Sequence, residues 1–298
     1  MSVIALFGPT ASGKTAVAEA IAARIPAELV SADSMQVYRG LPVLTNQAPA
    51  RLVAIWPLEH EASVGEYQRL AHEAIDEIVA AGRTPIVVGG TGLYLRAALA
   101  ELELPPAPAP DARKRWERLY DEQGADAAHT ELAERDPGAA AAVHPNDRRR
   151  VVRALELAEA GTSLRPERDR LWAAETRLPS VVFGLDVPKD VLEERIVART
   201  RAMFEQGVEA EVAAALGGPL SSTAAQVMGL REIAELPRDQ ALAALVVRSR
   251  RYAAYQRKWM RRIPGIVMLD GDRPPEEVAA AMVDAARARG VLTGARRP

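Results

Sequence analysis

The sequence predicts an α/β protein whose core is a parallel sheet flanked by helices, and two patterns in the chain indicate this class. Short apolar runs at residues 3–7, 27–33 and 84–90 alternate with stretches of helical spacing over the first hundred residues. Alternation of this kind is typical of parallel sheets that carry helices on both faces. The 298 residues, with a hydrophobic fraction of 48%, suffice for one large domain or two smaller ones.

The helices of this first part follow from apolar residues at helical spacing. The first strand, 3–7, leads into a glycine-containing loop, and a helix then runs to about Ile25. A second helix is indicated by apolar residues from Tyr67 to Val79, and Gly82 ends it. The third apolar run, TPIVVGG at 84–90, is then a buried strand.

A proline-rich stretch, LPPAPAP at 104–110, interrupts the alternation. The next segment, to about residue 178, has helical periodicity and no convincing strand, and strand character returns at 179–187 and 265–270. An amphipathic helix at 279–289 follows. The predicted parts are a discontinuous α/β core with C-terminal helices, 1–104 and 179–298, and an all-helical insertion, 105–178.

Composition excludes several kinds of chemistry. The chain has no cysteine, and its four histidines are scattered, which argues against disulfides, thiolate sites and zinc. The net charge of −2 gives no global attraction to nucleic acid, so any basic surface must be local. No apolar run approaches the ~20 residues of a membrane span, and the first residues form a strand rather than a signal peptide. We expect a cytoplasmic protein without membrane contact.

The loop after the first strand matches the phosphate-binding pattern GxxxxGK[ST], with a strand before it and a helix after it. Glycines let backbone N–H groups point inward, and the N-terminus of the following helix favours an anion. Lys14 supplies a point charge, and the Thr15 hydroxyl suits Mg²⁺. The pattern does not reveal what carries the phosphates. The loop residues are Gly8, Pro9, Thr10, Ala11, Ser12, Gly13, Lys14 and Thr15.

Asp33 ends the second apolar run, AELVSAD at 27–33. In an open α/β sheet this position lies beside the phosphate loop. Two roles stay open for its carboxylate: a ligand of Mg²⁺, directly or through water, or a general base that takes a proton from a nucleophile. A GTPase is disfavoured because no NKxD-type motif is present, whereas a kinase is the default for such a loop.

Arg199 falls on the apolar stripe of a helix that begins near Pro188, together with Leu192, Ile196 and Met203. An arginine among core-facing positions either extends its guanidinium to solvent or meets an anion. In the second case it would face the phosphates from the side opposite Lys14 and stabilise a leaving group.

Two arginine-rich segments form local basic patches. RSRRYAAYQRKWMRR (248–262) places Tyr252, Tyr255 and Trp259 among its basic residues, and HPNDRRRVVRALE (144–156) opens a helix that Asn146 or Asp147 could cap. Each patch taken singly is consistent with a solvated helix face. Together, arginines with aromatic platforms are the composition expected for an RNA partner.

These motifs, in their order along the chain, resemble the tRNA dimethylallyltransferases, also called tRNA isopentenyltransferases. The blocks VGGTGLYL and HPNDRRRVVRALE are the most specific part of the resemblance, which extends from residue 3 to about 270. Its other segments are GPTASGKT (8–15), SADSMQVYRGL (31–41), EERIVARTRAMFEQGVEAEV (193–212), VMGLREI (227–233) and the YAAYQRKWMRR segment.

The resemblance implies an enzyme that transfers a dimethylallyl group from dimethylallyl diphosphate to N6 of adenosine 37, next to the tRNA anticodon, and releases diphosphate. The loop would hold the prenyl diphosphate together with Mg²⁺. Lys14 and Arg199 would face the diphosphate, and Asp33 would be the base. The partners are the tRNA anticodon stem-loop and the diphosphate donor, and we expect a monomer. The implied tRNA contacts are Asp33, Ser34, Met35, Gln36, Thr91, Arg113, Arg149, Arg150, Val151, Val152, Arg153, Gln226, Val227, Met228, Gly229, Leu230 and Arg231.

The chain departs from the family pattern at several places, two of which bear on RNA contacts. LTNQAP (44–49) stands where GTAKP is usual, and AAYQRKW (253–259) stands for AKRQxTW. Two alternatives to the prenyltransferase are a kinase that phosphorylates a small metabolite with ATP and a nucleotide-dependent RNA-binding module. The first leaves the VGGTG block without a role, and the second leaves Asp33 without one.

Overall fold

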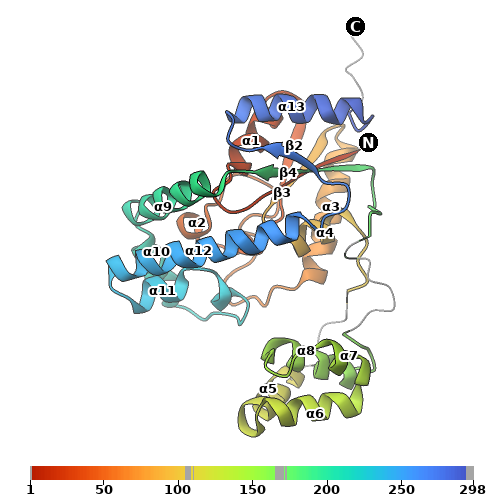
Figure 1. The fold of residues 1–298 in the computed structure, drawn as a ribbon, viewed down its shortest axis with the longest axis vertical. Coiled ribbons are helices and arrows are strands. Elements are labelled where there is room, and N and C mark those ends of the chain that lie inside the picture. The colour runs from red at the N-terminus through yellow and green to blue at the C-terminus, as the bar shows by residue number, and fades with distance from the viewer. Residues whose placement is uncertain (1, 105–108, 110, 165–170, 172, 293–298) are drawn as a thin grey trace. The chain divides into compact units, whose positions relative to one another are not determined.

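A computed structural model describes residues 2–104, 109, 111–164, 171 and 173–292 of the chain (Figure 1). The chain divides into two compact units, Met1–Glu101 with Leu171–Pro298, and Leu102–Arg170. The first holds a sheet and the second is helical in its described residues, which confirms the predicted fold class. The second unit ends at Arg170 rather than at the predicted 178, because the chain from Leu171 onward bonds back to the sheet-containing unit.

The sheet of the larger unit has five parallel strands in the order β2-β3-β1-β4-β5. The apolar runs seen in the sequence become these strands, since strands covered on both faces are apolar throughout. The phosphate loop follows the central strand, β1. The strands are β1 (Val3–Phe7), β2 (Ala27–Ser31), β3 (Thr84–Gly89), β4 (Ser180–Asp186) and β5 (Val267–Asp270).

Helices cover both faces of the sheet (Figure 1). Helices α1 (Lys14–Ala22) and α13 (Pro275–Ala288) pack side by side on one face, in an apolar cluster that includes Ile21, Phe183 and Met282. Helices α3 (Val64–Ala80) and α4 (Gly92–Leu99) contact each other and cover β1, β2 and β3 on the other face.

The remaining helices of this unit lie beyond the carboxyl ends of the strands. The long helix α12 (Arg238–Met260) packs against α9 (Lys189–Glu205) through Leu192, Ile196 and Ala253. No helix within the described residues is both long and apolar enough to span a membrane. The other elements here are α2 (Pro42–Thr45), α10 (Val208–Leu216), η2 (Ala224–Gln226) and α11 (Leu230–Glu235).

The helical unit has a core of its own. Trp116, Leu132 and Leu155 are buried where α8 packs on the helices before it. The Asp147 carboxylate accepts a hydrogen bond from the Arg150 N–H, so Asp147 caps α8, one of the two caps expected from the sequence. The helices are α5 (Ala112–Gln123), α6 (Ala125–Arg135), α7 (Pro137–Ala142) and α8 (Arg148–Glu159).

Arg96 on α4 is the largest fully buried side chain of the larger unit. Its guanidinium donates to the carbonyl oxygens of Leu171 at 2.9 Å and Ala173 at 2.8 Å. A buried cation of this kind is tolerated because backbone acceptors replace its hydration. Arg96 therefore fixes the segment that brings the chain back to the sheet.

We expect Arg96→Met to lower the free energy of unfolding by about 2 kcal/mol, because it removes the buried donor of two backbone hydrogen bonds. Urea unfolding followed by circular dichroism measures the change. The matched control is Arg69→Met, an exposed arginine that pairs with Glu73 across one helical turn, and it should cost less than about 0.5 kcal/mol. Equal losses in both variants would contradict the structural role of Arg96.

Candidate active site

The phosphate loop curls between β1 and α1 around a buried hydroxyl group. Gly13 has a φ of 87° and begins α1, so the chain turns sharply before the helix. Ser12 is buried, and among the described residues its Oγ has no hydrogen-bond partner. A buried hydroxyl without a partner is costly, and a ligand with acceptor oxygens would satisfy it.

Lys14 lies at the start of α1, and its Nζ donates to the Pro9 carbonyl oxygen at 2.6 Å. Desolvation lowers the pKa of Lys14 from 10.5 to about 8; the charge of Asp33 opposes this, and the charge of Arg199 adds to it. The three groups named from the sequence as catalytic therefore act on one another electrostatically within one site.

Arg199, on α9, points to the loop rather than to solvent. Its Nη1 donates to the Thr10 hydroxyl at 2.8 Å. Desolvation lowers the pKa of Arg199, and the Asp33 carboxylate partly offsets that effect. Of the two alternatives left open by the sequence, this geometry fits a guanidinium that meets an anion.

Asp33 lies beyond the end of β2, among three tyrosines. Its Oδ1 accepts from the Met35 N–H at 2.9 Å. Desolvation first, and the negative charge of Asp33 in addition, raise the pKa values of Tyr67, Tyr94 and Tyr252. Asp33 is half-buried, and its charge acts both on these phenols and on the two cations.

A small, mainly apolar pocket of about 20 Å³, partly open to solvent, adjoins Thr10 and Arg199. Sequence analysis missed it, because its walls come from α2, α9, α12 and the segment before α11, which are far apart in the chain. The apolar lining is Leu44, Ile196, Met203, Met228 and Leu245.

The donors present fit a metal only together with phosphate oxygens. Among the described residues, no group of three or more His, Cys, Asp or Glu could hold a metal ion. The Thr15 hydroxyl, in the first turn of α1, has no hydrogen-bond partner in the described part of the chain. Mg²⁺ takes one or two protein ligands and completes its shell with water and phosphate, so this donor set suits it.

Several residues expected to contact tRNA lie close to this site. The Ser34 N–H and hydroxyl both contact the Thr91 hydroxyl at 3.2 Å. The Gln36 amide donates to the carbonyl oxygens of Thr45 and Asn46, which holds the loop after α2. Met35 is half-buried beside them.

The segment 226–231 divides into exposed and buried parts. Val227 and Leu230 are 3% and 2% exposed, so their side chains are closed to RNA, contrary to the list taken from the resemblance. Met228 lines the apolar pocket. Gln226 and Arg231 remain exposed.

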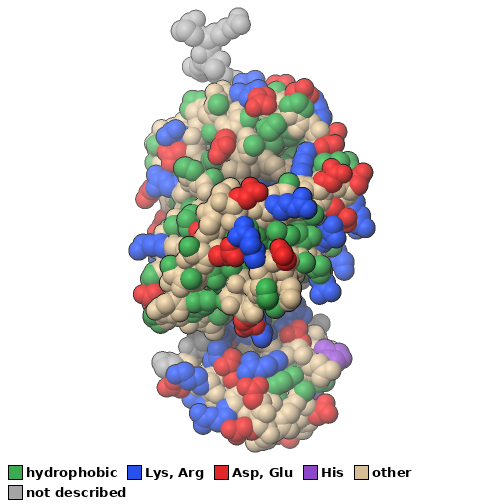
Figure 2. All heavy atoms as spheres, turned by 90° about the vertical axis from the view of Figure 1, so that its left-hand side faces the viewer, with side chains coloured by type: hydrophobic (Ala, Val, Ile, Leu, Met, Phe, Trp, Pro, Cys, Tyr) green, Lys and Arg blue, Asp and Glu red, His purple; other side chains and the backbone are tan. Residues whose placement is uncertain are grey.

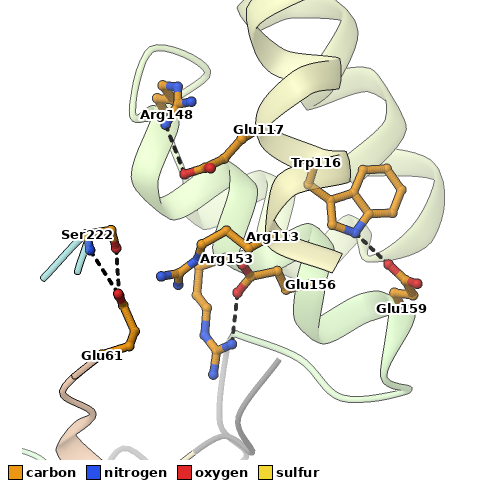
Figure 3. A network of polar contacts seen from close by, with 9 residues as sticks. All are labelled: Glu61, Arg113, Trp116, Glu117, Arg148, Arg153, Glu156, Glu159 and Ser222. Atoms are coloured by element: carbon orange, nitrogen blue, oxygen red, sulfur yellow. Dashed lines mark hydrogen bonds and ion pairs between the residues drawn. The ribbon is translucent and has the colours of Figure 1, made fainter. Parts of the chain in front are cut away.

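The helical unit contains a buried carboxylate between two arginines (Figure 3). Glu156 accepts from Arg113 Nε at 2.8 Å and from Arg153 Nη1 at 2.9 Å, with no side-chain exposure of its own. It holds the two guanidinium groups side by side. Sequence analysis missed Glu156, because it reads as one acid at the end of a basic run.

The other residues expected at this surface differ in exposure. Val151 and Val152 are 0% and 3% exposed in the core of the helical unit, so their side chains are not RNA contacts. They lie on the face of α8 opposite Arg149 and Arg150, which are exposed. On the face that Figure 2 shows, cationic and anionic side chains are interspersed.

The aromatic residues of α12 form a ladder on the helix surface. Ring centroids of Tyr252 and Tyr255 are 6.4 Å apart, and those of Tyr255 and Trp259 are 6.5 Å apart. Tyr255 is 54% exposed. The Tyr252 hydroxyl lies 3.5 Å from Thr91 Oγ1, so the ladder begins next to Asp33 and Ser34.

The parallel sheet, its phosphate loop and the two cations beside Asp33 define a P-loop protein with a site for a phosphate-bearing substrate. The IPP transferase family model matches residues 36–263, and an isopentenyl transferase model matches residues 1–51. The chain belongs to the IPP transferase family. It is a transferase with tRNA dimethylallyltransferase activity.

The relatives have the same extent as this chain. A tRNA dimethylallyltransferase of Thermobifida fusca is 39% identical over 92% of this chain and 91% of its own. One of Streptomyces coelicolor is 40% identical over 90% of each chain. The crystal structure of the tRNA isopentenylpyrophosphate transferase of Bacillus halodurans has 31% identity and a TM-score of 0.69, and covers 97% of this chain and 98% of its own.

We expect the affinity of the free protein for inorganic pyrophosphate to fall as pH rises through about 8, the pKa of Lys14. Below that pH the ammonium is charged and attracts the anion; above it the neutral amine does not. Calorimetric titrations from pH 6.5 to 9.5 measure the trend. Lys14→Arg is the control, since a guanidinium keeps its charge and this variant shows only the titration of the ligand itself. Parallel curves for both proteins would contradict the prediction.

Proposed function

We propose that the chain transfers the dimethylallyl group of dimethylallyl diphosphate to N6 of adenosine 37 of tRNA, with the donor diphosphate in the phosphate loop. The observation that carries this proposal is the convergence of Lys14, Arg199 and Asp33 on one loop. Two cations suit a departing diphosphate, and one carboxylate suits a base. The kinase alternative is not supported, since the family catalyses another reaction.

The loop and its cations would stabilise the leaving group. The N–H groups at the start of α1 and the charge of Lys14 favour an anion. Arg199 approaches Thr10 from another helix, and a guanidinium there counters charge that grows on diphosphate as the C–O bond breaks. Both cations are poorly solvated, so their effect on that charge is greater than it would be in water.

Mg²⁺ would be held by the Thr15 hydroxyl and by diphosphate oxygens, and would supply further positive charge to the leaving group. Ser12 Oγ, buried without a partner among the described residues, gives the loop another polar group to face those oxygens.

The apolar side chains of the small pocket suit contact with the five-carbon chain of the donor. Leu44, Ile196, Met203, Met228 and Leu245 line the pocket together with Thr10 and Arg199. A donor whose diphosphate is bound by the loop would thus have apolar side chains next to its carbon chain, where burial is favourable.

Asp33 would accept the proton of the adenine amine. The lone pair of that amine is delocalised into the ring, so the nitrogen is a poor nucleophile until its proton can leave. A carboxylate within reach of the amine removes the proton as the C–N bond forms. The half-buried Asp33, whose charge acts on both the phenols and the cations, supports this role.

The tRNA would be held by backbone contacts and by stacking. Exposed Arg149 and Arg150 suit phosphates, and Glu156 orients Arg113 and Arg153. The ladder of Tyr252, Tyr255 and Trp259 suits bases that have left their stack. Taking the target base out of the anticodon loop costs a few kcal/mol, which these contacts offset. The monomeric state and the cytoplasmic location expected from the sequence stay predictions.

The direct test mixes the protein with labelled dimethylallyl diphosphate, Mg²⁺ and unmodified tRNA that has adenine next to the anticodon. We expect label in the RNA with the wild type. Asp33→Asn, which keeps the shape and loses the base, should lower kcat at least a hundredfold while tRNA still binds in a filter assay. ATP consumption without label in RNA would refute the function, and near-normal turnover of Asp33→Asn would refute the base.

We expect Arg149→Gln to reduce the salt dependence of tRNA binding by about one unit of slope, because it removes one phosphate contact. Arg148, one residue earlier on α8, is the matched control. Its guanidinium donates to both carboxylate oxygens of Asp121 at 2.8 and 2.7 Å, and this pairing raises its pKa. Arg148→Gln should change the slope less, since that charge is already compensated. Equal slopes in the two variants would remove α8 from the proposed interface.

A further inference from the structure

Gln256 on α12 joins the phosphate loop to the end of β3 through both ends of its amide. Its Oε1 accepts from the Thr10 N–H at 2.7 Å, and its Nε2 donates to the Gly90 carbonyl oxygen at 2.9 Å. The side chain is 2% exposed, so water does not compete with either bond. No part of the function described above uses this residue.

Thr10 is thereby held from two helices at once. Its N–H is bound by Gln256 on α12, while its hydroxyl accepts from Arg199 on α9. N–H groups of a phosphate loop ordinarily point toward the anion, but that of Thr10 is committed to a protein acceptor. The position of the Thr10 hydroxyl, and with it the direction of the Arg199 guanidinium, therefore depends on Gln256.

This position requires one hydrogen-bond acceptor and one donor on the same carbon atom, and a primary amide supplies both. A glutamate would set a carboxylate oxygen against the Gly90 carbonyl, a methionine offers neither bond, and an asparagine is one carbon shorter. Gly90 is part of the same arrangement. A Cβ there would lie 2.1 Å from Gln256 Nε2, so a residue with a side chain would displace the amide.

We propose that Gln256 is a positioning residue for the leaving-group step: without touching substrate, it fixes Thr10 so that Arg199 faces the departing diphosphate. This rests on the proposed function of the loop. A displaced guanidinium loses its interaction with charge that develops only in the transition state, and this lowers kcat more than it raises KM. Misplacement by about 1 Å can cost about a hundredfold in rate.

The test compares Gln256→Met and Gln256→Asn with a variant that loses a buried hydrogen bond elsewhere in the same unit. Tyr38→Phe is that control, since the Tyr38 hydroxyl contacts Thr223 Oγ1 at 2.5 Å and lies outside the loop. We expect Gln256→Met to lower kcat at least tenfold, with less than a threefold rise in KM for dimethylallyl diphosphate and unchanged tRNA binding. Gln256→Asn should lower kcat less, and Tyr38→Phe should keep kcat within twofold.

A double-variant cycle separates positioning from general destabilisation. In an Arg199→Ala background, the further change Gln256→Met should lower kcat by no more than about threefold, because the group that Gln256 positions is already gone. The proposal would be overturned if the fold-reduction in kcat of the double variant equalled the product of the two single-variant reductions. A kcat of Gln256→Met within threefold of the wild type would also overturn it.

Binding of inorganic pyrophosphate, measured by calorimetry, gives a readout that needs no turnover. Gln256→Met should weaken it at least threefold in the wild-type background and less than 1.5-fold in the Arg199→Ala background. A wild type without prenyl transfer would refute the proposed function, whereas this titration would still test whether Gln256 acts through Arg199. Equal weakening in both backgrounds would overturn the positioning role.

Discussion

The parallel pairing of β1 between β3 and β4 is the constraint on which the site depends. In a parallel sheet all carboxyl ends meet at one edge. The strand order alone therefore brings together three features: the loop after β1, Asp33 after β2 and Thr91 after β3. Helix α9 follows β4 at the same edge and brings Arg199 to Thr10. The chemistry of the site is thus a consequence of strand order and of the residues that happen to follow each strand.

Electrostatics then determine what this edge can bind. Lys14 and Arg199 both lose hydration there. Desolvation above all, and the charge of Arg199 in addition, lower the pKa of Lys14 to about 8. A single carboxylate, Asp33, opposes this without removing it. An added polyanion relieves the repulsion of the two cations at once, which makes the loop selective for a ligand of high charge. In the proposed reaction, a diphosphate bound by the cations would leave the Asp33 carboxylate to take the proton.

Sequence patterns predicted the features that depend on residues close together in the chain. Continuous apolar runs marked the buried strands, and the polar residue in the apolar stripe of α9 marked Arg199. Contacts between distant segments were not predictable: Gln256 meets Thr10 across 246 positions, and the apolar pocket draws on four separate elements. The resemblance identified segments rather than side chains, and it therefore included Val151, Val152, Val227 and Leu230, which the folded units bury. Helical periodicity on α8 would have separated Val151 and Val152 from their exposed neighbours, whereas Val227 lies outside the helices.

The glycines of the VGGTG block have no reactive side chain, yet they determine how closely α12 packs beside the site. A Cβ at Gly90 would strike the Gln256 amide, and one at Gly92 would lie 2.1 Å from the Trp259 ring. Both neighbours belong to α12, so the glycines let this helix lie against the end of β3. The same helix exposes Tyr255 on its outer side. One helix thus contacts the phosphate loop through Gln256 and carries an aromatic surface at the next residue, Tyr255.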